Sequence, residues 1–99
     1  MGRLYPPLDC GKVNETVERS ALECGFSFKR VLPRNEPSIR CEWHLKRNKD
    51  IWVEKDSEMR IKVSSDNYII VIGESWGMDC FGYETLENVI RCWAHGSMP

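Results

Sequence analysis

A Cys-x-x-His spacing occurs twice in this 99-residue sequence and could bind a metal. Cys41 precedes His44 by three positions, and Cys92 precedes His95 by the same interval. Two thiolates and two imidazoles are a ligand set that zinc accepts in structural sites. The first pair falls in a predicted strand, where residues three apart point to opposite faces. We therefore expect no bound metal. Zinc binding stays a third hypothesis, with Cys92 and His95 as its candidates.

Catalytic chemistry is not indicated elsewhere in the sequence. A cysteine or serine nucleophile needs a histidine base and an orienting carboxylate, and the chain has only two histidines. The GxSxG, HExxH, GxxxxGK[ST] and GxGxxG motifs are all absent. Cys80 follows Asp79 and has no evident cationic neighbour that would lower its thiol pKa. We expect a protein that is not an enzyme and needs no cofactor.

The number of cysteines predicts a redox state. An odd number, with an N-terminus that lacks the apolar run of a secretory signal peptide, favours free thiols in a reducing compartment. The longest apolar run, residues 68–72, is far shorter than the roughly twenty residues that a membrane helix needs. We therefore expect a cytoplasmic protein with no membrane association. The five cysteines are Cys10, Cys24, Cys41, Cys80 and Cys92.

Helix signals stand near both ends of the sequence. Residues 1–13 contain two consecutive prolines and predict an irregular lead-in to a single domain over residues 14–99. Asn14 is suited to cap a first helix, which Gly25 would end. A second helix is predicted over residues 84–95. Its apolar stripe consists of Leu86, Val89, Ile90 and Trp93.

Between the helices, apolar residues recur at every second position, which is typical of half-buried antiparallel strands. The clearest strand has, on one face, Ile39, Cys41, Trp43 and Leu45. Other short runs lie at residues 26–32, 51–53, 59–63 and 68–72. The last run is apolar on both faces, so another strand, a helix or a second copy of the chain must cover its edge. We predict an α+β fold, a single small domain in which one helix precedes and one follows an antiparallel sheet of four to five strands.

Charge is segregated along the chain, although the net charge is only -1. Residues 29–62 carry ten basic and six acidic residues, a net charge of +4. Residues 63–99 carry one basic and five acidic residues, a net charge of -4. A near-neutral chain differs from the strongly basic domains that usually bind nucleic acid. The two charged segments nevertheless predict two surfaces of opposite sign.

Nucleic-acid binding on the polar face of the sheet is our alternative hypothesis. Strand alternation places several basic side chains on this face, and Trp52 could stack on a base. In the simpler interpretation this face has no binding role and is only solvated, because charged residues must lie somewhere on the surface. The residues of this alternative are Arg40, His44, Lys46, Trp52, Arg60 and Lys62.

The segment 73–83, between the last strand and the second helix, combines three glycines with several large side chains. Loops often carry function, and exposed Trp and Tyr are frequent anchors of protein interfaces. In the competing interpretation, Trp76 and Phe81 fold back to close the core, and residues 78–81 form a short additional strand.

Our first hypothesis is a small, intracellular, non-enzymatic protein-binding or regulatory module of the adaptor, inhibitor or accessory type. A homodimer formed through residues 68–72 is a variant of it. The expected partner-binding residues are Trp76, Phe81, Tyr83, Glu74 and Asp79.

Overall fold

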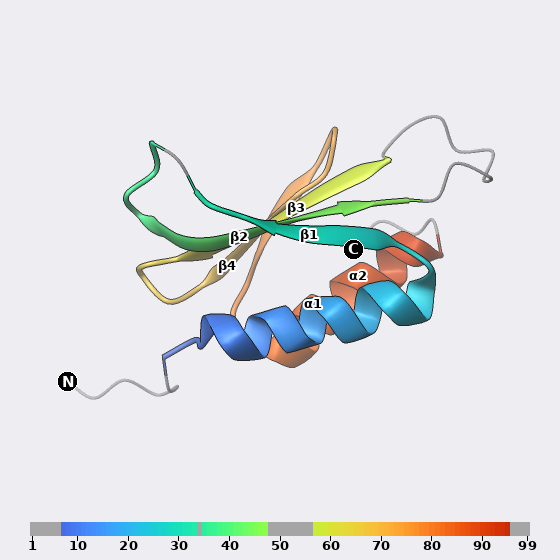
Figure 1. Ribbon diagram of the computed structural model, residues 1–99, viewed down its shortest axis with the longest axis horizontal. Helices are drawn as coiled ribbons and strands as arrows, with labels where there is room; N and C mark the ends of the chain where they lie inside the picture. The colour runs from blue at the N-terminus through green and yellow to red at the C-terminus, as the bar shows by residue number, and fades with distance from the viewer. Residues whose placement is uncertain (1–6, 34, 48–56, 96–99) are drawn as a thin grey trace.

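The computed structural model of the protein describes residues 7–33, 35–47 and 57–95 (Figure 1). The elements are α1 (Cys10–Cys24), β1 (Ser27–Val31), β2 (Ile39–Lys46), β3 (Glu58–Ser64), β4 (Ile69–Ile72), β5 (Gly77–Cys80) and α2 (Tyr83–Ala94). The five strands form one antiparallel sheet in chain order, and both helices lie on the same face of it. The predicted α+β class is confirmed. The short strand expected at residues 51–53 lies outside the described residues.

Helix α1 is capped five residues earlier than the sequence predicts. Its N-cap is Asp9, whose Oδ1 accepts a hydrogen bond from the Gly11 amide at 2.8 Å. Residues 10–13, expected to be irregular, are therefore helical. The prediction of Asn14 as the cap is wrong, because Asp9 is an equally good capping residue and starts the helix one turn earlier. Asn14 instead accepts a hydrogen bond at 2.8 Å from the indole nitrogen of Trp43.

The other helix ends follow the prediction closely. Gly25 ends α1 with a φ of 78°, in the left-handed region that favours glycine, and its amide donates to the Leu22 carbonyl at 3.3 Å. Helix α2 begins and ends one residue before the predicted positions. All four residues of its predicted apolar stripe are buried.

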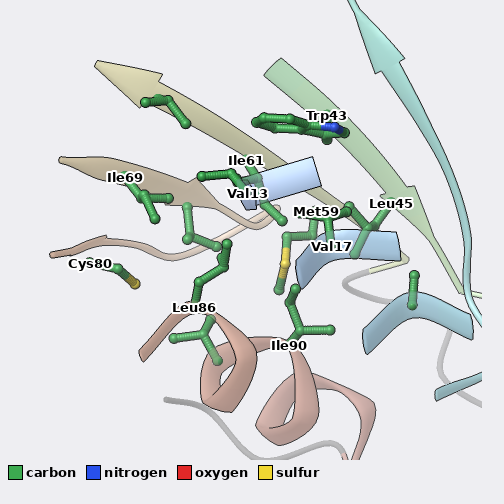
Figure 2. Packing of buried hydrophobic residues seen from close by; sticks show 14 of the residues in the cluster. Val13, Val17, Trp43, Leu45, Met59, Ile61, Ile69, Cys80, Leu86 and Ile90 are labelled. Atoms are coloured by element: carbon green, nitrogen blue, oxygen red, sulfur yellow. The ribbon is translucent and has the colours of Figure 1, made fainter. Parts of the chain in front are cut away.

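The hydrophobic core lies between the inner face of the sheet and the two helices (Figure 2). Figure 2 shows Leu86 and Ile90 of α2 pointing toward the strands, where Met59 and Ile69 are also fully buried. Each fully buried side chain of this size contributes about 1.5–3 kcal/mol through the hydrophobic effect. Because both helices take up the inner face, the opposite face of the sheet has no helix against it in the described chain. We call this opposite face the outer face.

Strand β4, apolar on both faces, is paired along both of its edges. It lies between β3 and the short strand β5, with Ile69 opposite Cys80 and Ile72 opposite Gly77. Strand β5 overlaps the short extra strand of the competing interpretation. Because β3 and β5 already pair with the two edges of β4, a second copy of the chain cannot add a strand there. It would have to contact the side chains of β4 that lie on the outer face.

Cys10 and Cys41 form a disulfide, so the expectation that all five cysteines are free thiols is wrong. The bond joins the first turn of α1 to a core-facing position of β2, 31 positions along the chain. An odd number of cysteines permits such a pair, and the sequence spacing does not reveal that the two residues meet. The free cysteines are Cys24, Cys80 and Cys92.

Within residues 7–33, 35–47 and 57–95, no helix combines the length and the apolar character that crossing a bilayer requires. The cytoplasmic location stays a prediction.

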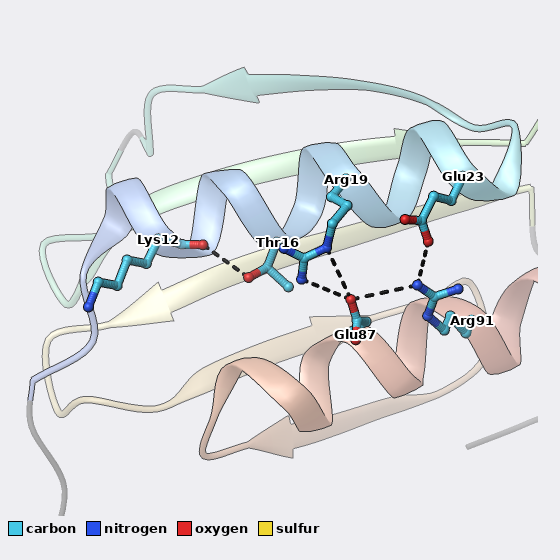
Figure 3. Close-up of polar contacts among 6 residues, drawn as sticks. All are labelled: Lys12, Thr16, Arg19, Glu23, Glu87 and Arg91. Atoms are coloured by element: carbon cyan, nitrogen blue, oxygen red, sulfur yellow. Dashed lines mark hydrogen bonds and ion pairs between the residues drawn. The ribbon is translucent and has the colours of Figure 1, made fainter.

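Four charged side chains connect the two helices (Figure 3). Arg19 Nη2 lies 2.9 Å from Glu87 Oε1, and Arg91 donates a hydrogen bond to Glu23 and lies 3.7 Å from Glu87. Because residue 19 meets 87 and residue 23 meets 91, the helices run parallel. The hydrogen bond from Arg19 lowers the pKa of Glu87 below its usual value, and the positive charges of Arg19 and Arg91 lower it further.

We expect reduction of the Cys10–Cys41 disulfide to lower the free energy of unfolding by about 3–4 kcal/mol, because the unfolded chain regains the entropy of the closed loop. Urea unfolding with and without dithiothreitol, followed by tryptophan fluorescence, measures this change. The double variant Cys10→Ser, Cys41→Ser should match the reduced protein and no longer respond to the reductant. Cys24→Ser, which removes a free thiol, is the control. An unchanged midpoint after reduction would contradict the expectation.

We expect Glu87→Gln to make stability less sensitive to acid. Since the folded-state pKa of Glu87 lies below its unfolded value, its pairing stabilises fully above the unfolded pKa and is lost as pH falls through the folded pKa. The free energy of unfolding is measured for the variant and the unmodified chain between pH 7 and pH 3, a range that spans ordinary glutamate titration. The two values should converge at low pH. Glu18→Gln, at an exposed position of α1, is the control. Parallel curves for Glu87→Gln and the unmodified chain would refute the expectation.

Candidate binding surface on the outer face of the sheet

Three basic or titratable side chains lie in one cross-strand row on the outer face. Lys29 of β1 is opposite His44 of β2, and His44 is opposite Arg60 of β3. Neighbouring strands lie about 4.8 Å apart, so these side chains are direct neighbours. We call Lys29, His44 and Arg60 the basic row. It continues onto β4, where Arg60 is opposite Ile72.

The next row along the outer face is closer to electrical neutrality. The carboxylate of Glu42 is buried, and its Oε2 lies 2.7 Å from the Nε2 of His44 in the basic row. Lys62 is opposite Glu42 but lies 2.9 Å from Glu36, and its side chain is only 13% exposed. The members of this row are, from β1 to β5, Val31, Glu42, Lys62, Ile70 and Asp79.

A groove of about 380 Å³ opens beside the basic row, across β1, β2 and β3. Lys46 and Glu58 also line it, 3.7 Å apart and both more than half exposed, so their attraction is weak. Lys29 and Arg60 make no ion pair with any other residue of the described chain. Leu45 and Met59 also line the groove, but both are buried core residues of the inner face, and Phe28 packs against the same core. The groove therefore offers a ligand mainly charged side chains, among them two cations that have no carboxylate partner in the described chain.

A smaller groove of about 240 Å³ adjoins the first. Glu58 and Arg60 line both grooves, and Ile72 and Glu74 line the smaller one. Glu74 accepts hydrogen bonds from the Ser57 amide at 3.3 Å and the Ser57 hydroxyl at 3.2 Å. Arg60 thus stands between the basic strands and the segment 73–83, which the sequence analysis treats as separate regions.

The aromatic residues expected to anchor a partner are placed differently from one another. Trp76 and Tyr83 are partly buried and pack against the hydrophobic core. The Tyr83 hydroxyl also accepts a hydrogen bond from the Asp9 amide at 3.0 Å. Phe81 is 68% exposed, and its ring centroid lies 6.3 Å from that of Tyr68. Of these three rings, only that of Phe81 is offered mainly to solvent.

The two acidic residues of that hypothesis lie beside the outer face. Asp79 of β5 is exposed and opposite Ile70, and exposed Glu74 lines the smaller groove. The acidic end of the chain thus adjoins the basic strands on one continuous sheet. Instead of two surfaces of opposite sign, the outer face has a basic part over β1–β3 and an acidic edge at β5.

The residues of the nucleic-acid alternative are also divided. Three of them, His44, Lys46 and Arg60, line the larger groove. Arg40 sits at a bulge of β2, and its guanidinium donates to the Leu8 carbonyl oxygen at 2.7 Å, so it ties the segment before α1 to the sheet. Lys62 is paired with Glu36. Trp52 lies outside the described residues.

The geometry of the Cys-x-x-His pairs gives little support to zinc binding. Cys41 is oxidised and faces the core, whereas His44 lies on the outer face, as the strand spacing predicts. Cys92 is half-buried and His95 is exposed as the C-cap of α2. In the part of the chain that the structure describes, no three His, Cys, Asp or Glu residues form a group that could hold a metal ion.

Cys80 is a buried thiol at the end of β5. Burial raises its pKa above the usual thiol value, and the negative charge of Asp79 raises it further. The sulfur therefore stays protonated at neutral pH, which makes it a poor nucleophile or metal ligand.

Sequence reasoning missed two basic residues that matter to the structure. Arg47 is buried, its guanidinium carbon lies 4.2 Å from the Trp93 ring centroid, and it donates to the Trp93 carbonyl oxygen. The odd-numbered residues of β2 face the core, and position 47 continues this series. The alternation therefore predicts burial of Arg47, but a charged residue is not expected in a core. Lys29 belongs to the basic row only through the register between β1 and β2.

Comparison with known proteins yields no match to a family model, to a curated protein or to a solved structure. The outer face, with two adjoining grooves and a row of basic side chains, is the candidate binding surface of the chain.

Proposed function

We propose that this protein is a small, non-enzymatic protein-binding module of the adaptor or accessory type that contacts its partner with the outer face of its sheet. One observation carries the proposal. In the described chain, no helix lies on this five-stranded face, which carries basic side chains on β1–β3, isoleucines on β4 and an acidic residue on β5. Interfaces between proteins combine apolar contacts with a polar rim in the same way.

The apolar part of the outer face lies on β4. Ile72 is 37% exposed and Ile70 is partly exposed, although both are large aliphatic residues of a regular strand. Arg60 is opposite Ile72 on one side, and Asp79 is opposite Ile70 on the other. Exposed aliphatic side chains flanked by both charges suit a protein surface as a partner.

Nucleic-acid binding has less support from the same face. Three of its basic or titratable side chains already have carboxylate neighbours, in the pairs His44 with Glu42, Lys46 with Glu58, and Lys62 with Glu36. A phosphate backbone drawn to this face would meet these carboxylates, although phosphate contacts supply most of the affinity for nucleic acids.

We expect Ile72→Asp to abolish capture of the partner. The tagged chain is incubated with a lysate of cells that express the protein, and bound proteins are measured by quantitative mass spectrometry. The substitution places a negative charge in the apolar part of the outer face. We expect the affinity for the partner to fall by at least about tenfold, which corresponds to about 1.4 kcal/mol of binding free energy. Circular dichroism checks that the variant is folded.

Leu22→Asp provides the matched control, because Leu22 is 66% exposed on α1, in the helix layer away from the outer face. This variant should capture the same partner as the unmodified chain. Loss of capture with Leu22→Asp alone would move the interface to the helices and overturn the proposal. Loss of capture after nuclease treatment would favour the nucleic-acid alternative, and no enrichment over the tag alone would also contradict the module.

A further inference from the structure

The basic row presents two exposed cations that have no carboxylate partner in the described chain. Lys29 and Arg60 flank His44 in register, and both are exposed. Of the three side chains, only His44 has a carboxylate partner, Glu42, in the described chain. An anion placed over the row would be attracted by both cations.

From this row we infer that the groove beside it binds the carboxylates of an acidic, extended segment of the partner protein. The inference rests on the proposed function and names the kind of partner. The guanidinium of Arg60 can bind a carboxylate through two parallel hydrogen bonds, and the ammonium of Lys29 adds a point charge about two strand spacings away. Both cations line the same groove of about 380 Å³.

The exposed aliphatic residue beside the row favours a polypeptide over a simple anion. Ile72 is 37% exposed, is opposite Arg60 and lines the smaller groove together with it. In an extended segment, successive side chains point to opposite sides, so carboxylates on the row would alternate with side chains on the other side of the segment. An aliphatic residue on the same side of the segment, beyond the carboxylates, would contact Ile72, so that the segment combines charged and apolar contacts.

The carboxylates around the row favour a short acidic segment over a nucleic acid. Glu58 lines both grooves, and Glu74 lines the smaller one. A phosphate chain carries one charge per nucleotide and would run past the row onto these carboxylates. A protein segment can end its acidic stretch at the row and place apolar residues opposite Ile72.

The test uses as its probe a fluorescein-labelled twelve-residue peptide in which three glutamates alternate with valines at the centre and serine and glycine fill both ends. Fluorescence anisotropy follows its binding to the full chain at about 50 mM salt, where attraction between exposed charges is least screened. Comparison probes are the glutamine–valine and lysine–valine peptides of equal length and a single-stranded oligothymidylate of twelve nucleotides. We expect saturable binding of the acidic peptide and much weaker binding of the other three.

Lys29→Glu and Arg60→Glu should each weaken binding of the acidic peptide by about tenfold or more, because each reverses a charge that faces the ligand. Lys12→Glu is the matched control, since Lys12 is exposed on α1 and the change in net charge is the same. It should alter the affinity by less than about twofold, because charges beyond a Debye length are screened. Both positions in the row are exposed, and thermal unfolding verifies that the variants fold.

Each contrary result overturns the inference. Tighter binding of the oligothymidylate, lost in Lys29→Glu and Arg60→Glu, would make the row a phosphate site. Equal binding of the acidic and neutral peptides, or no saturable binding of the acidic peptide, would remove the role of carboxylates. The broader proposal has a separate measurement: if the acidic peptide does not bind but the partner is captured and this capture is lost in Ile72→Asp, only the carboxylate inference fails.

Discussion

Trp43 is fully buried in β2, and its indole nitrogen donates a hydrogen bond to Asn14 of α1 at 2.8 Å. A buried indole N–H without a partner would cost about 1–3 kcal/mol, so this bond favours one placement of the helix on the strand. Two residues earlier in β2, Cys41 is bonded covalently to Cys10 in the first turn of the same helix. These contacts hold α1 on the inner face, and α2 packs beside it. The arrangement leaves the outer face without a helix against it in the described chain.

The outer face brings together residues that are distant in the sequence. The basic row comes from β1, β2 and β3, whereas the acidic residues Glu74 and Asp79 come from the segment before α2. Because β4 lies between β3 and β5, its isoleucines separate the two kinds of charge. Although the net charge of the chain is close to zero, the charge is separated across the outer face, which is basic at one side and acidic at the other.

The periodic parts of the fold were predictable from the sequence, and the contacts between them were not. Alternation predicted β2 and β3, and the apolar stripe predicted α2, because burial on one side leaves a repeat in the residue types. The start of α1 was missed because Asp9 and Asn14 are both good caps. The disulfide and the basic row depend on which residues meet in space, and the register of strand pairs determines this. The candidate site was thus predicted in part, with His44, Lys46 and Arg60 identified and Lys29 overlooked.

The order of the strands has a consequence for how the chain folds. Each strand pairs with its neighbour in the sequence, so the whole sheet can assemble through local hairpins with little loss of chain entropy. The contact between the helices is different, since Arg19 and Glu87 are 68 positions apart. Proteins rich in local contacts fold quickly, and long-range contacts must wait for the segments between them to be ordered. The antiparallel sheet can thus form early in folding. The contact between α1 and α2 forms later, on the inner face of this sheet.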